Sequence, residues 1–223
     1  MEKVLLHTPE GVRDVYGKEC AVKLTIENSI NKVFNIYGYH NIQTPTFEFF
    51  DIFSKERGSV ASKNLYKFFD REGNTLVLRP DVTPSIARLV AKYYMDVKVP
   101  VKLCYNANTY INNSELQGKL KENTQLGCEL INDDSVEADA EILALVVDSL
   151  KAAGLKEFLV EIGHADFYKG LLEECGFDTE NEQELRKRIE NKNYFGVEEI
   201  LDNNNITGQL KEAFLKLPEL FGS

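Results

Sequence analysis

The feature that most constrains this chain is a pair of apolar runs joined by a polar connection. The runs are VKLCYNANTYI at 101–111 and NTQLGCELI at 123–131, and the connection is NNSELQGKLKE at 112–122. Apolar runs of this length on either side of a polar segment are typical of two antiparallel strands. The sequence therefore predicts an antiparallel sheet, and a connection this long in a compact domain is usually functional or mobile.

A hairpin and a helix start are predicted just before these strands. The hairpin covers 68–78, with its turn at 72–74, where a glycine stands between two polar residues. Thr83 is predicted to be the N-cap of the next helix, with Pro84 at its first position. The polar side chains of Asp81 and Thr83 then lie where a strand gives way to a helix.

The remaining pattern places helices around shorter strands. Hydrophobic periodicity predicts an amphipathic helix at 17–38, and Ser135 is a suitable N-cap for another at 135–153. The aromatic-rich stretch at 41–53 predicts a strand, with Pro45 at an edge or bulge, and then a short helix. Further predictions are a strand at 157–163, a helix at 165–174, and two helices within about 181–217 that are separated by DNNN at 202–205. Together these elements predict an α+β fold in which helices flank an antiparallel sheet.

The chain is predicted to divide into two regions. Residues 1–174 carry the sheet and its helices, whereas the composition after about residue 175 shifts toward charged, helix-forming residues. This shift predicts a helical subregion or insert at 175–223. The sequence LKLPELFGS stops just after a helix without a closing strand. We therefore expect the domain to be truncated at its C-terminus and its sheet to be incomplete.

The net charge and the spacing of the cysteines argue against several classes of protein. The 36 acidic and 26 basic residues give a formal net charge of −10, which disfavours nucleic-acid binding. The four cysteines are dispersed without metal-ligand spacing, so we expect no metal, no cofactor and a reducing cytoplasmic location. The N-terminal MEKVLLHTPEG lacks the apolar region of a signal peptide, and no segment approaches the roughly 20 apolar residues of a membrane span.

Four segments, taken in order, resemble the class II synthetase fold as histidyl-tRNA synthetases and their relatives carry it. They are TPEGVRD at 8–14, YGYHNIQTPTFE at 37–48, LRPDVT at 78–83 and NTQLGCELI at 123–131. The second is similar to part of the family's motif 1, which builds the dimer interface, so the resemblance implies a homodimer. The fourth is similar to the strand that ends motif 2.

By this resemblance a histidine pocket contains Asp81, Thr83, Gln125 and Glu129. The first three would hold the ammonium group of histidine, and Glu129 would face the imidazole. Carboxylate, amide and hydroxyl oxygens are suitable acceptors for both groups. Asp81 replaces the glutamate usual in the synthetases, so its reach is one methylene shorter. The alternative is that Asp81 and Thr83 only cap a helix, while Gln125 and Glu129 are solvated strand residues.

The positions similar to the family's ATP site hold unsuitable residues. Ile111 stands where an arginine clamps the α-phosphate, Asn113 where a glutamate follows, and Asn123 where a phenylalanine stacks on adenine. Isoleucine donates no hydrogen bond to phosphate, and loss of a positioned donor typically costs about 100- to 1,000-fold in rate. The resemblance thus implies a protein without catalytic residues that binds histidine and does not activate it.

This combination resembles the regulatory subunits that pair with the short form of ATP phosphoribosyltransferase, the first enzyme of histidine biosynthesis. The segment EIGHADFYKGLLEECGF at 161–177 is also similar to these proteins, although a lone His164 after a strand is more often structural. The resemblance implies a hetero-octamer with the catalytic subunit and feedback regulation by free histidine. Two alternatives stay open, namely a divergent histidyl-tRNA synthetase and another amino-acid-sensing synthetase paralogue.

Overall fold

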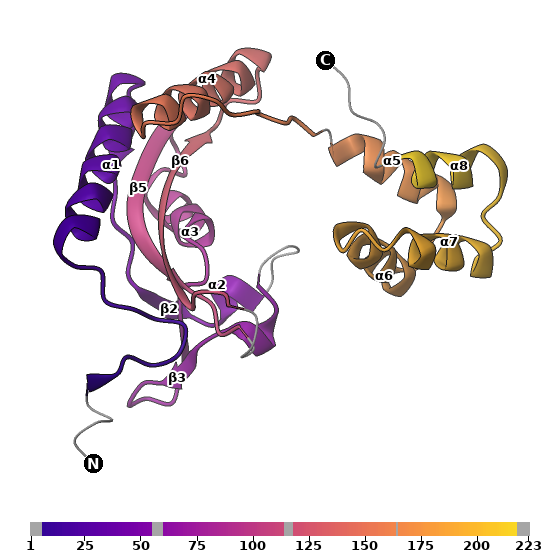
Figure 1. Ribbon diagram of the computed structural model, residues 1–223, viewed down its shortest axis with the longest axis horizontal. Helices are drawn as coiled ribbons and strands as arrows, with labels where there is room; N and C mark the ends of the chain where they lie inside the picture. Colours follow the sequence, from indigo (N-terminus) through magenta and orange to yellow (C-terminus); the bar gives the residue numbers. More distant parts are fainter. Residues whose placement is uncertain (1–5, 55–59, 114–117, 164, 218–223) are drawn as a thin grey trace. The chain divides into compact units, whose positions relative to one another are not determined.

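The computed structural model of the chain describes residues 6–54, 60–113, 118–163 and 165–217 (Figure 1). His164 and part of the long connection, at 114–117, lie outside the described residues. No helix within the described ranges has the length and apolar character that crossing a bilayer requires. The chain forms two compact units, Met1–Phe158 and Leu159–Ser223, and each is described by itself.

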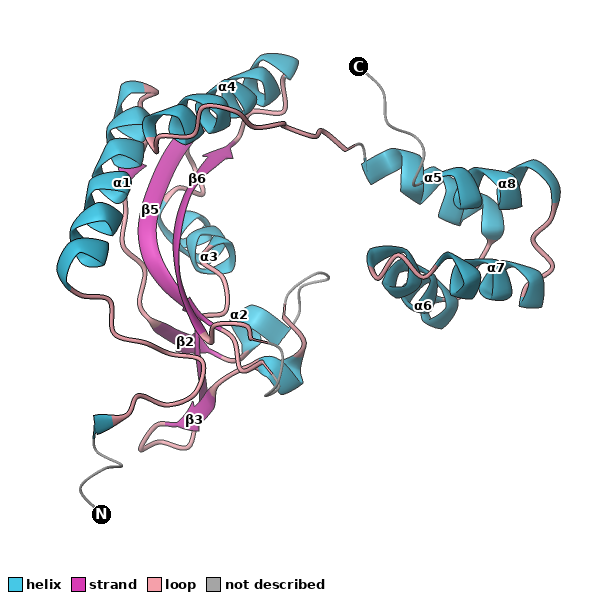
Figure 2. Cartoon of the chain, in the orientation of Figure 1, coloured by secondary structure: helices cyan, strands magenta, loops and turns pink. Residues whose placement is uncertain are grey.

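The first unit contains two three-stranded sheets (Figure 2). The larger has the order β1–β5–β6 and consists of β1 (His40–Asn41), β5 (Val101–Tyr110) and β6 (Glu122–Ile131). The smaller has the order β2–β4–β3 and consists of β2 (Phe47–Phe49), β4 (Thr75–Leu78) and β3 (Lys67–Phe69). The antiparallel pairing of β5 with β6 and of β3 with β4 confirms the two predicted strand pairs. The parallel pairing of β1 with β5 adds a contact that the local pattern does not predict.

Helices cover both faces of the larger sheet (Figure 1). One face packs against α1 (Gly17–Ile36) and α4 (Val136–Ala152), and the other packs against α3 (Thr83–Tyr93). The buried residues are Phe34, Tyr39, Cys104 and Leu145 on the first face and Val82, Ile86, Val101, Leu103 and Tyr105 on the second. Because side chains alternate along a strand, even-numbered residues of β5 and β6 face α1 and α4, and odd-numbered ones face α3. The short helices α2 (Asp51–Ser54) and η2 (Ser62–Asn64) lie between β2 and β3 in the sequence.

The two predicted N-caps have different outcomes. Ser135 caps α4, because its Oγ accepts a hydrogen bond from the backbone N–H of Ala138 at 3.2 Å. Helix α3 begins at Thr83 itself, with Val82 in the N-cap position and no side-chain cap. The prediction of Thr83 as N-cap is therefore wrong by one residue. The Thr83 hydroxyl donates across to Glu129 instead of bonding to the first turn of its own helix.

The strand predicted at 157–163 is not formed. These residues have no strand assignment, and the side chains of Leu159 and Ile162 are 82% and 74% exposed. An extended segment becomes a strand only when a neighbour satisfies its backbone groups. No such partner pairs with this segment in the described part of the chain.

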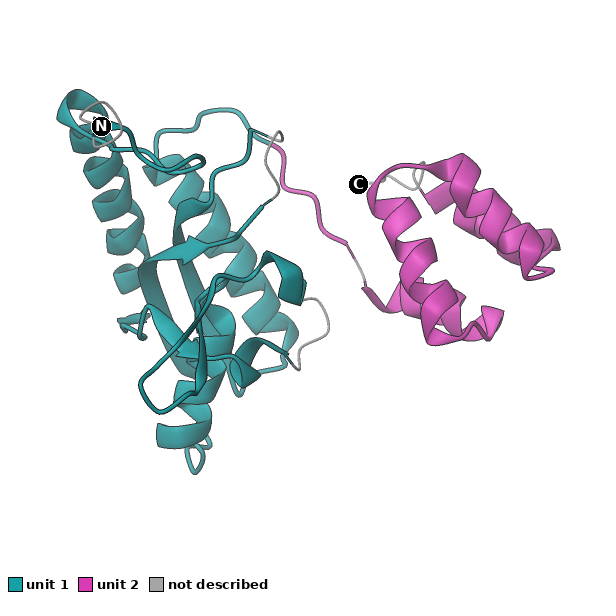
Figure 3. Cartoon of the chain, turned by 90° about the horizontal axis from the view of Figure 1, so that it is seen from below, with its two compact units in different colours: residues 1–158 teal, residues 159–223 magenta. Residues whose placement is uncertain are grey.

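The second unit is helical (Figure 3). It consists of α5 (Ala165–Cys175), α6 (Thr179–Glu190), α7 (Tyr194–Asn203) and α8 (Gly208–Lys216). Its fully buried core residues are Leu185, Val197, Leu201 and Phe214. Helix α5 packs on this core through Tyr168, Leu171 and Leu172, so it belongs with the helices that follow it. The structure therefore divides the chain after Phe158, earlier than the boundary expected between residues 174 and 175.

Candidate ligand-binding site

The structure brings together the four residues that the resemblance places in a histidine pocket. Asp81 and Thr83 lie where β4 leads into α3, whereas Gln125 and Glu129 lie on the α3 face of β6. Thr83 Oγ1 donates to Glu129 Oε1 at 2.7 Å, and Gln125 Nε2 donates to Asp81 Oδ1 at 3.3 Å. These two hydrogen bonds connect the helix start to the strand. The four residues, with Tyr105 and Gly127 described next, are called the Asp81–Glu129 cluster.

Two residues that the sequence prediction leaves out complete this cluster. Tyr105 on β5 lies directly opposite Gly127 on β6, and its hydroxyl accepts a hydrogen bond from Gln125 Nε2 at 3.2 Å. A Cβ atom at Gly127 would lie 2.4 Å from the Tyr105 hydroxyl oxygen, so only glycine leaves room for the tyrosine. Both residues lie inside the two apolar runs. Finding them from sequence requires the register of the strands, which the runs alone do not supply.

The cluster carries two carboxylates and no cation. Neither Asp81 nor Glu129 forms an ion pair with a described residue. Burial raises the pKa of Glu129 and the Asp81 charge raises it further, while the Thr83 hydrogen bond acts in the opposite direction. Burial also raises the pKa of Tyr105 to about 12, and the negative charges of Glu129 and Asp81 add to this. Half-buried carboxylates without a counter-ion favour a cationic ligand.

The helix-capping alternative does not explain this geometry. Asp81 Oδ1 accepts a hydrogen bond from the backbone N–H of Val82 at 2.7 Å, which is a local contact at the helix start. Gln125 and Glu129, however, are half-buried rather than solvated, and each bonds to a residue from the β4–α3 junction. The Asp81–Val82 contact is local to the helix start but does not cap α3, and the capping alternative does not account for the contacts between the strand and the junction.

The three positions that the resemblance assigns to a degenerate ATP site lie together at the far ends of β5 and β6. The backbone N–H of Ile111 donates to the Lys121 carbonyl at 2.9 Å, which continues the strand pairing. The side-chain amides of Asn113 and Asn123 both donate to the Leu120 carbonyl at 3.3 Å. The side chains of Asn113 and Asn123 thus bond to the backbone near the end of the connection. They supply neither a cation for a phosphate nor an aromatic ring for a base.

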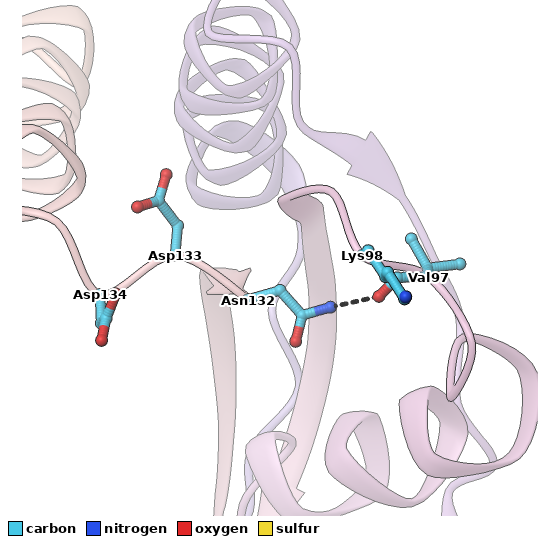
Figure 4. Close-up of a pocket in the computed structure, with 5 residues that line it drawn as sticks. All are labelled: Val97, Lys98, Asn132, Asp133 and Asp134. Atoms are coloured by element: carbon cyan, nitrogen blue, oxygen red, sulfur yellow. Dashed lines mark hydrogen bonds between the residues drawn. The ribbon is translucent and has the colours of Figure 1, made fainter.

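Hollows on the described part of the first unit include one lined by Tyr105 with Val82 and Arg79, and one lined by Asn123 with Leu120. Another hollow, of about 640 Å³, lies between Val97–Lys98 and the segment 132–134 (Figure 4). Asn132 Nδ2 donates across it to the Val97 carbonyl at 2.8 Å, while the carboxylates of Asp133 and Asp134 point in different directions. Its polar groups do not converge on one point, as they do in most specific sites. Volume alone therefore does not identify the binding site.

Comparison with known proteins assigns the chain to a class. The family model described as histidyl-tRNA synthetase matches residues 11–223. The chain therefore belongs to the histidyl-tRNA synthetase family, and the expected α+β fold of the class II synthetases is confirmed.

The relatives within this family narrow the comparison. The chain is 46% identical to an ATP phosphoribosyltransferase regulatory subunit of Ruminiclostridium cellulolyticum, over 100% of this chain and 53% of the relative. It is 43% identical to the corresponding protein of Acetivibrio thermocellus, over 98% of this chain and 52% of the relative. The resemblance to these regulatory subunits is thus confirmed, and the chain spans about half the length of the curated relatives it matches.

Solved structures give the same result. The crystal structure of an ATP phosphoribosyltransferase regulatory subunit/histidyl-tRNA synthetase from Bacillus halodurans matches with a TM-score of 0.84 and 36% identity, covering 97% of this chain and 56% of that one. A histidine–tRNA ligase subunit from Alicyclobacillus acidocaldarius matches with a TM-score of 0.77 and 26% identity, covering 88% and 56%. The chain is therefore similar both to a structure named as a regulatory subunit/histidyl-tRNA synthetase and to one named as a histidine–tRNA ligase subunit.

Proposed function

We propose that this chain belongs to a noncatalytic regulatory subunit that binds free histidine at the Asp81–Glu129 cluster. The observation that carries the proposal is the pair of half-buried carboxylates, Asp81 and Glu129, that no cation of the described chain neutralises. Histidine offers an ammonium group and an imidazole N–H, which are the donors that such acceptors require. In this proposal Asp81, Thr83 and Gln125 hold the ammonium group, and Glu129 faces the imidazole.

The hydrogen bonds of Gln125 support this assignment. Its Nε2 donates both to Asp81 and to the Tyr105 hydroxyl, so the side-chain amide is fixed from two sides. The amide oxygen then remains as an acceptor for a ligand donor. Tyr105 acts as a positioning residue in this proposal, because it holds Gln125 rather than supplying a charge.

The proposed lack of catalysis rests on Ile111, Asn113 and Asn123. In place of a positioned arginine and a stacking ring, these positions carry an aliphatic side chain and two amides that bond to the connection itself. An ATP–pyrophosphate exchange assay with histidine tests this against the synthetase alternative. We expect no exchange above background, and robust exchange would reject the regulatory function.

We propose that the partner is the short-form catalytic subunit of ATP phosphoribosyltransferase in the cytoplasm. The names of the relatives support this, since a regulatory subunit requires an enzyme to regulate. Histidine would then reduce the activity of the catalytic subunit only in the complex, a coupling between two separate sites. The proposed assembly is a hetero-octamer in which two copies of this chain associate through 37–48, with no nucleic acid or membrane involved. Inhibition of the isolated catalytic subunit to the same extent would reject this arrangement.

Calorimetric titration with histidine tests the site itself. We expect Asp81→Asn and Glu129→Gln each to weaken binding by about 1–3 kcal/mol, because each removes the negative charge from the acceptor of the ammonium group or of the imidazole N–H. Glu137→Gln on the exposed face of α4 is a matched control that should leave the affinity unchanged. If the cluster variants bind histidine as tightly as this control, the site lies elsewhere.

A further inference from the structure

Two cysteines lie directly opposite each other on the sheet that carries the cluster. Cys104 on β5 pairs in register with Cys128 on β6, so their side chains lie on the same face. That face packs against α1 and α4, and it is the reverse of the face that carries the Asp81–Glu129 cluster. Cys104 is fully buried and Cys128 is half-buried, and both are free thiols.

The backbone hydrogen bonds show whether Cys104 and Cys128 form a hydrogen-bonded or a non-hydrogen-bonded pair of the antiparallel ladder. The Cys104 carbonyl accepts a hydrogen bond from Ile42 N at 2.9 Å, so the backbone of Cys104 is turned toward β1 and away from β6. The Ile111 N–H bonds to the Lys121 carbonyl, which places the hydrogen-bonded pairs of this ladder at odd-numbered residues of β5. Cys104 and Cys128 therefore form a non-hydrogen-bonded pair, in which Cα atoms are about 4.5 Å apart. This separation falls within the range of roughly 4.4–6.8 Å that disulfides span.

We propose that Cys104 and Cys128 form a reversible cross-strand disulfide on oxidation by a peroxide, and that this bond weakens histidine binding on the opposite face. The first part depends only on the geometry of the two cysteines. The second part rests on the proposed function of the Asp81–Glu129 cluster. The experiments below separate the two parts.

The reaction balances with hydrogen peroxide as the oxidant. The thiolate of Cys128, which is the less buried of the two residues, attacks one peroxide oxygen, and the O–O bond breaks to give a sulfenic acid and hydroxide, which takes up a proton as water. The Cys104 sulfur then displaces the sulfenic oxygen, so an S–S bond forms, an S–O bond breaks and a second water leaves. Burial raises the pKa of Cys128 to about 11, with the charges of Glu129 and Glu141 adding to it, and burial also raises the pKa of Cys104. Both thiols are therefore mostly protonated at neutral pH, so only a small thiolate fraction reacts and the reaction is slow.

The bond would act on the cluster through the backbone of the two strands. Cys104 precedes Tyr105, and Cys128 stands between Gly127 and Glu129. To form the bond, the Cys104 sulfur must leave its contact with Asn41 Oδ1 at 3.5 Å and turn toward β6. Tyr105 and Gly127 tolerate little relative movement, because the tyrosine hydroxyl already fills the space of a glycine Cβ. A shift of either strand therefore changes the position of Gln125 and Glu129.

Mass spectrometry of the peroxide-treated protein tests the bond. We expect the intact chain to lose two hydrogen atoms, a linked peptide pair to contain Cys104 and Cys128, and dithiothreitol to reverse the change. Cys128→Ser should abolish the linked peptides, and Cys128→Ala serves as a second variant if the first unfolds. Cys20→Ser is the matched control and should leave the linkage intact. Linkage through Cys20 or Cys175, or persistent free thiols at Cys104 and Cys128, would overturn the proposal.

Histidine calorimetry on the oxidised and reduced protein tests the coupling. We expect the oxidised protein to bind histidine at least about fivefold more weakly, which is the lower end of typical coupling between sites. Equal affinity in the two forms would overturn the coupling while the mapped disulfide stands. If the reduced protein does not bind histidine at all, the proposed function and the coupling fail together, and the mapped disulfide decides the first part alone.

Discussion

At the scale of single residues, Gly127 is the most constrained position of the cluster. A Cβ atom there would meet the Tyr105 hydroxyl at 2.4 Å, so Gly127→Ala should displace the tyrosine from its hydrogen bond with Gln125. We expect the free energy of unfolding to fall by about 1–3 kcal/mol, as in other overpacked sites. Denaturant unfolding measures this, with Gly170→Ala in α5 as control. Because nothing lies within 4 Å of a Cβ at Gly170, that variant should be unchanged or up to about 1 kcal/mol more stable. Equal losses in both variants would contradict the steric argument.

Glu129 gives a prediction about pH. Because folding raises its pKa, the protonated carboxyl stabilises the fold; this contribution is complete below the ordinary glutamate pKa and is lost as the pH rises through the folded value. Glu129→Gln imitates the protonated form, so the variant should unfold at a higher temperature than the wild type near neutral pH. The difference should shrink toward zero as the pH falls past the ordinary glutamate pKa. Thermal unfolding at several pH values measures this, and a difference that does not change with pH would count against it.

The residues of the cluster were predictable to different degrees. Asp81, Thr83, Gln125 and Glu129 follow from two short segments that resemble a known pocket, and the structure brings them together. Tyr105 and Gly127 do not follow in the same way, because their roles depend on facing each other across two strands. A polar residue can be recognised from its chemistry, whereas a steric fit requires the register.

At the scale of secondary-structure elements, Arg79 lies just after β4 and connects that strand to β5 and to the segment 44–45. Its guanidinium donates to the carbonyls of Asn108 and Thr44, both at 2.8 Å, and of Pro45 at 3.2 Å, and the residue is buried. Arg79→Met leaves these carbonyls without donors, so we expect the free energy of unfolding to fall by about 2–4 kcal/mol. The free energy of unfolding of Arg79→Lys should lie between those of Arg79→Met and the wild type, because one ammonium group cannot reach all three carbonyls. Arg71→Met at the exposed hairpin turn is the control and should stay within about 0.5 kcal/mol, so a similar loss there would contradict this role.

The elements that were predictable are those with local signals. The hairpin at 68–78, most of the helices and the two long strands each follow from turn residues, caps or apolar runs, whereas the break between α6 and α7 at 191–193 is not predicted. The two-residue strand β1 and its parallel partner do not, because a parallel pair joins segments that are far apart in sequence. The segment 157–163 fails for the opposite reason. Its composition suits a strand, but no partner strand pairs with it in the described chain.

At the scale of the whole molecule, the helical unit Leu159–Ser223 has a core of its own. Phe214 is fully buried in it and packs edge-on against Tyr168, with ring centroids 6.3 Å apart. We expect Phe214→Ala to destabilise this unit by about 3–5 kcal/mol, through lost burial and the cavity that remains. Limited proteolysis should then cut within 165–217 while the first unit stays resistant. Phe195→Ala, at a side chain that is 82% exposed, is the matched control, and cleavage of both variants at the same rate would contradict a separate core.

The proposed homodimer gives a further prediction at this scale, because one face of the smaller sheet carries an exposed aromatic surface. Strand register places Phe47, Phe49 and Phe68 on that face, where they are 51%, 56% and 37% exposed. Exposed apolar surface of this kind often marks a site of association, and Phe47 belongs to the segment 37–48. We expect Phe47→Ser to shift the protein from dimer to monomer in analytical ultracentrifugation with little change in thermal unfolding. Phe195→Ser removes a similar side chain from the helical unit and should leave the sedimentation unchanged. A Phe47→Ser protein that sediments as a dimer at the same concentration would move the interface away from this face, since the lost aromatic contact is the interaction that the dimer would require.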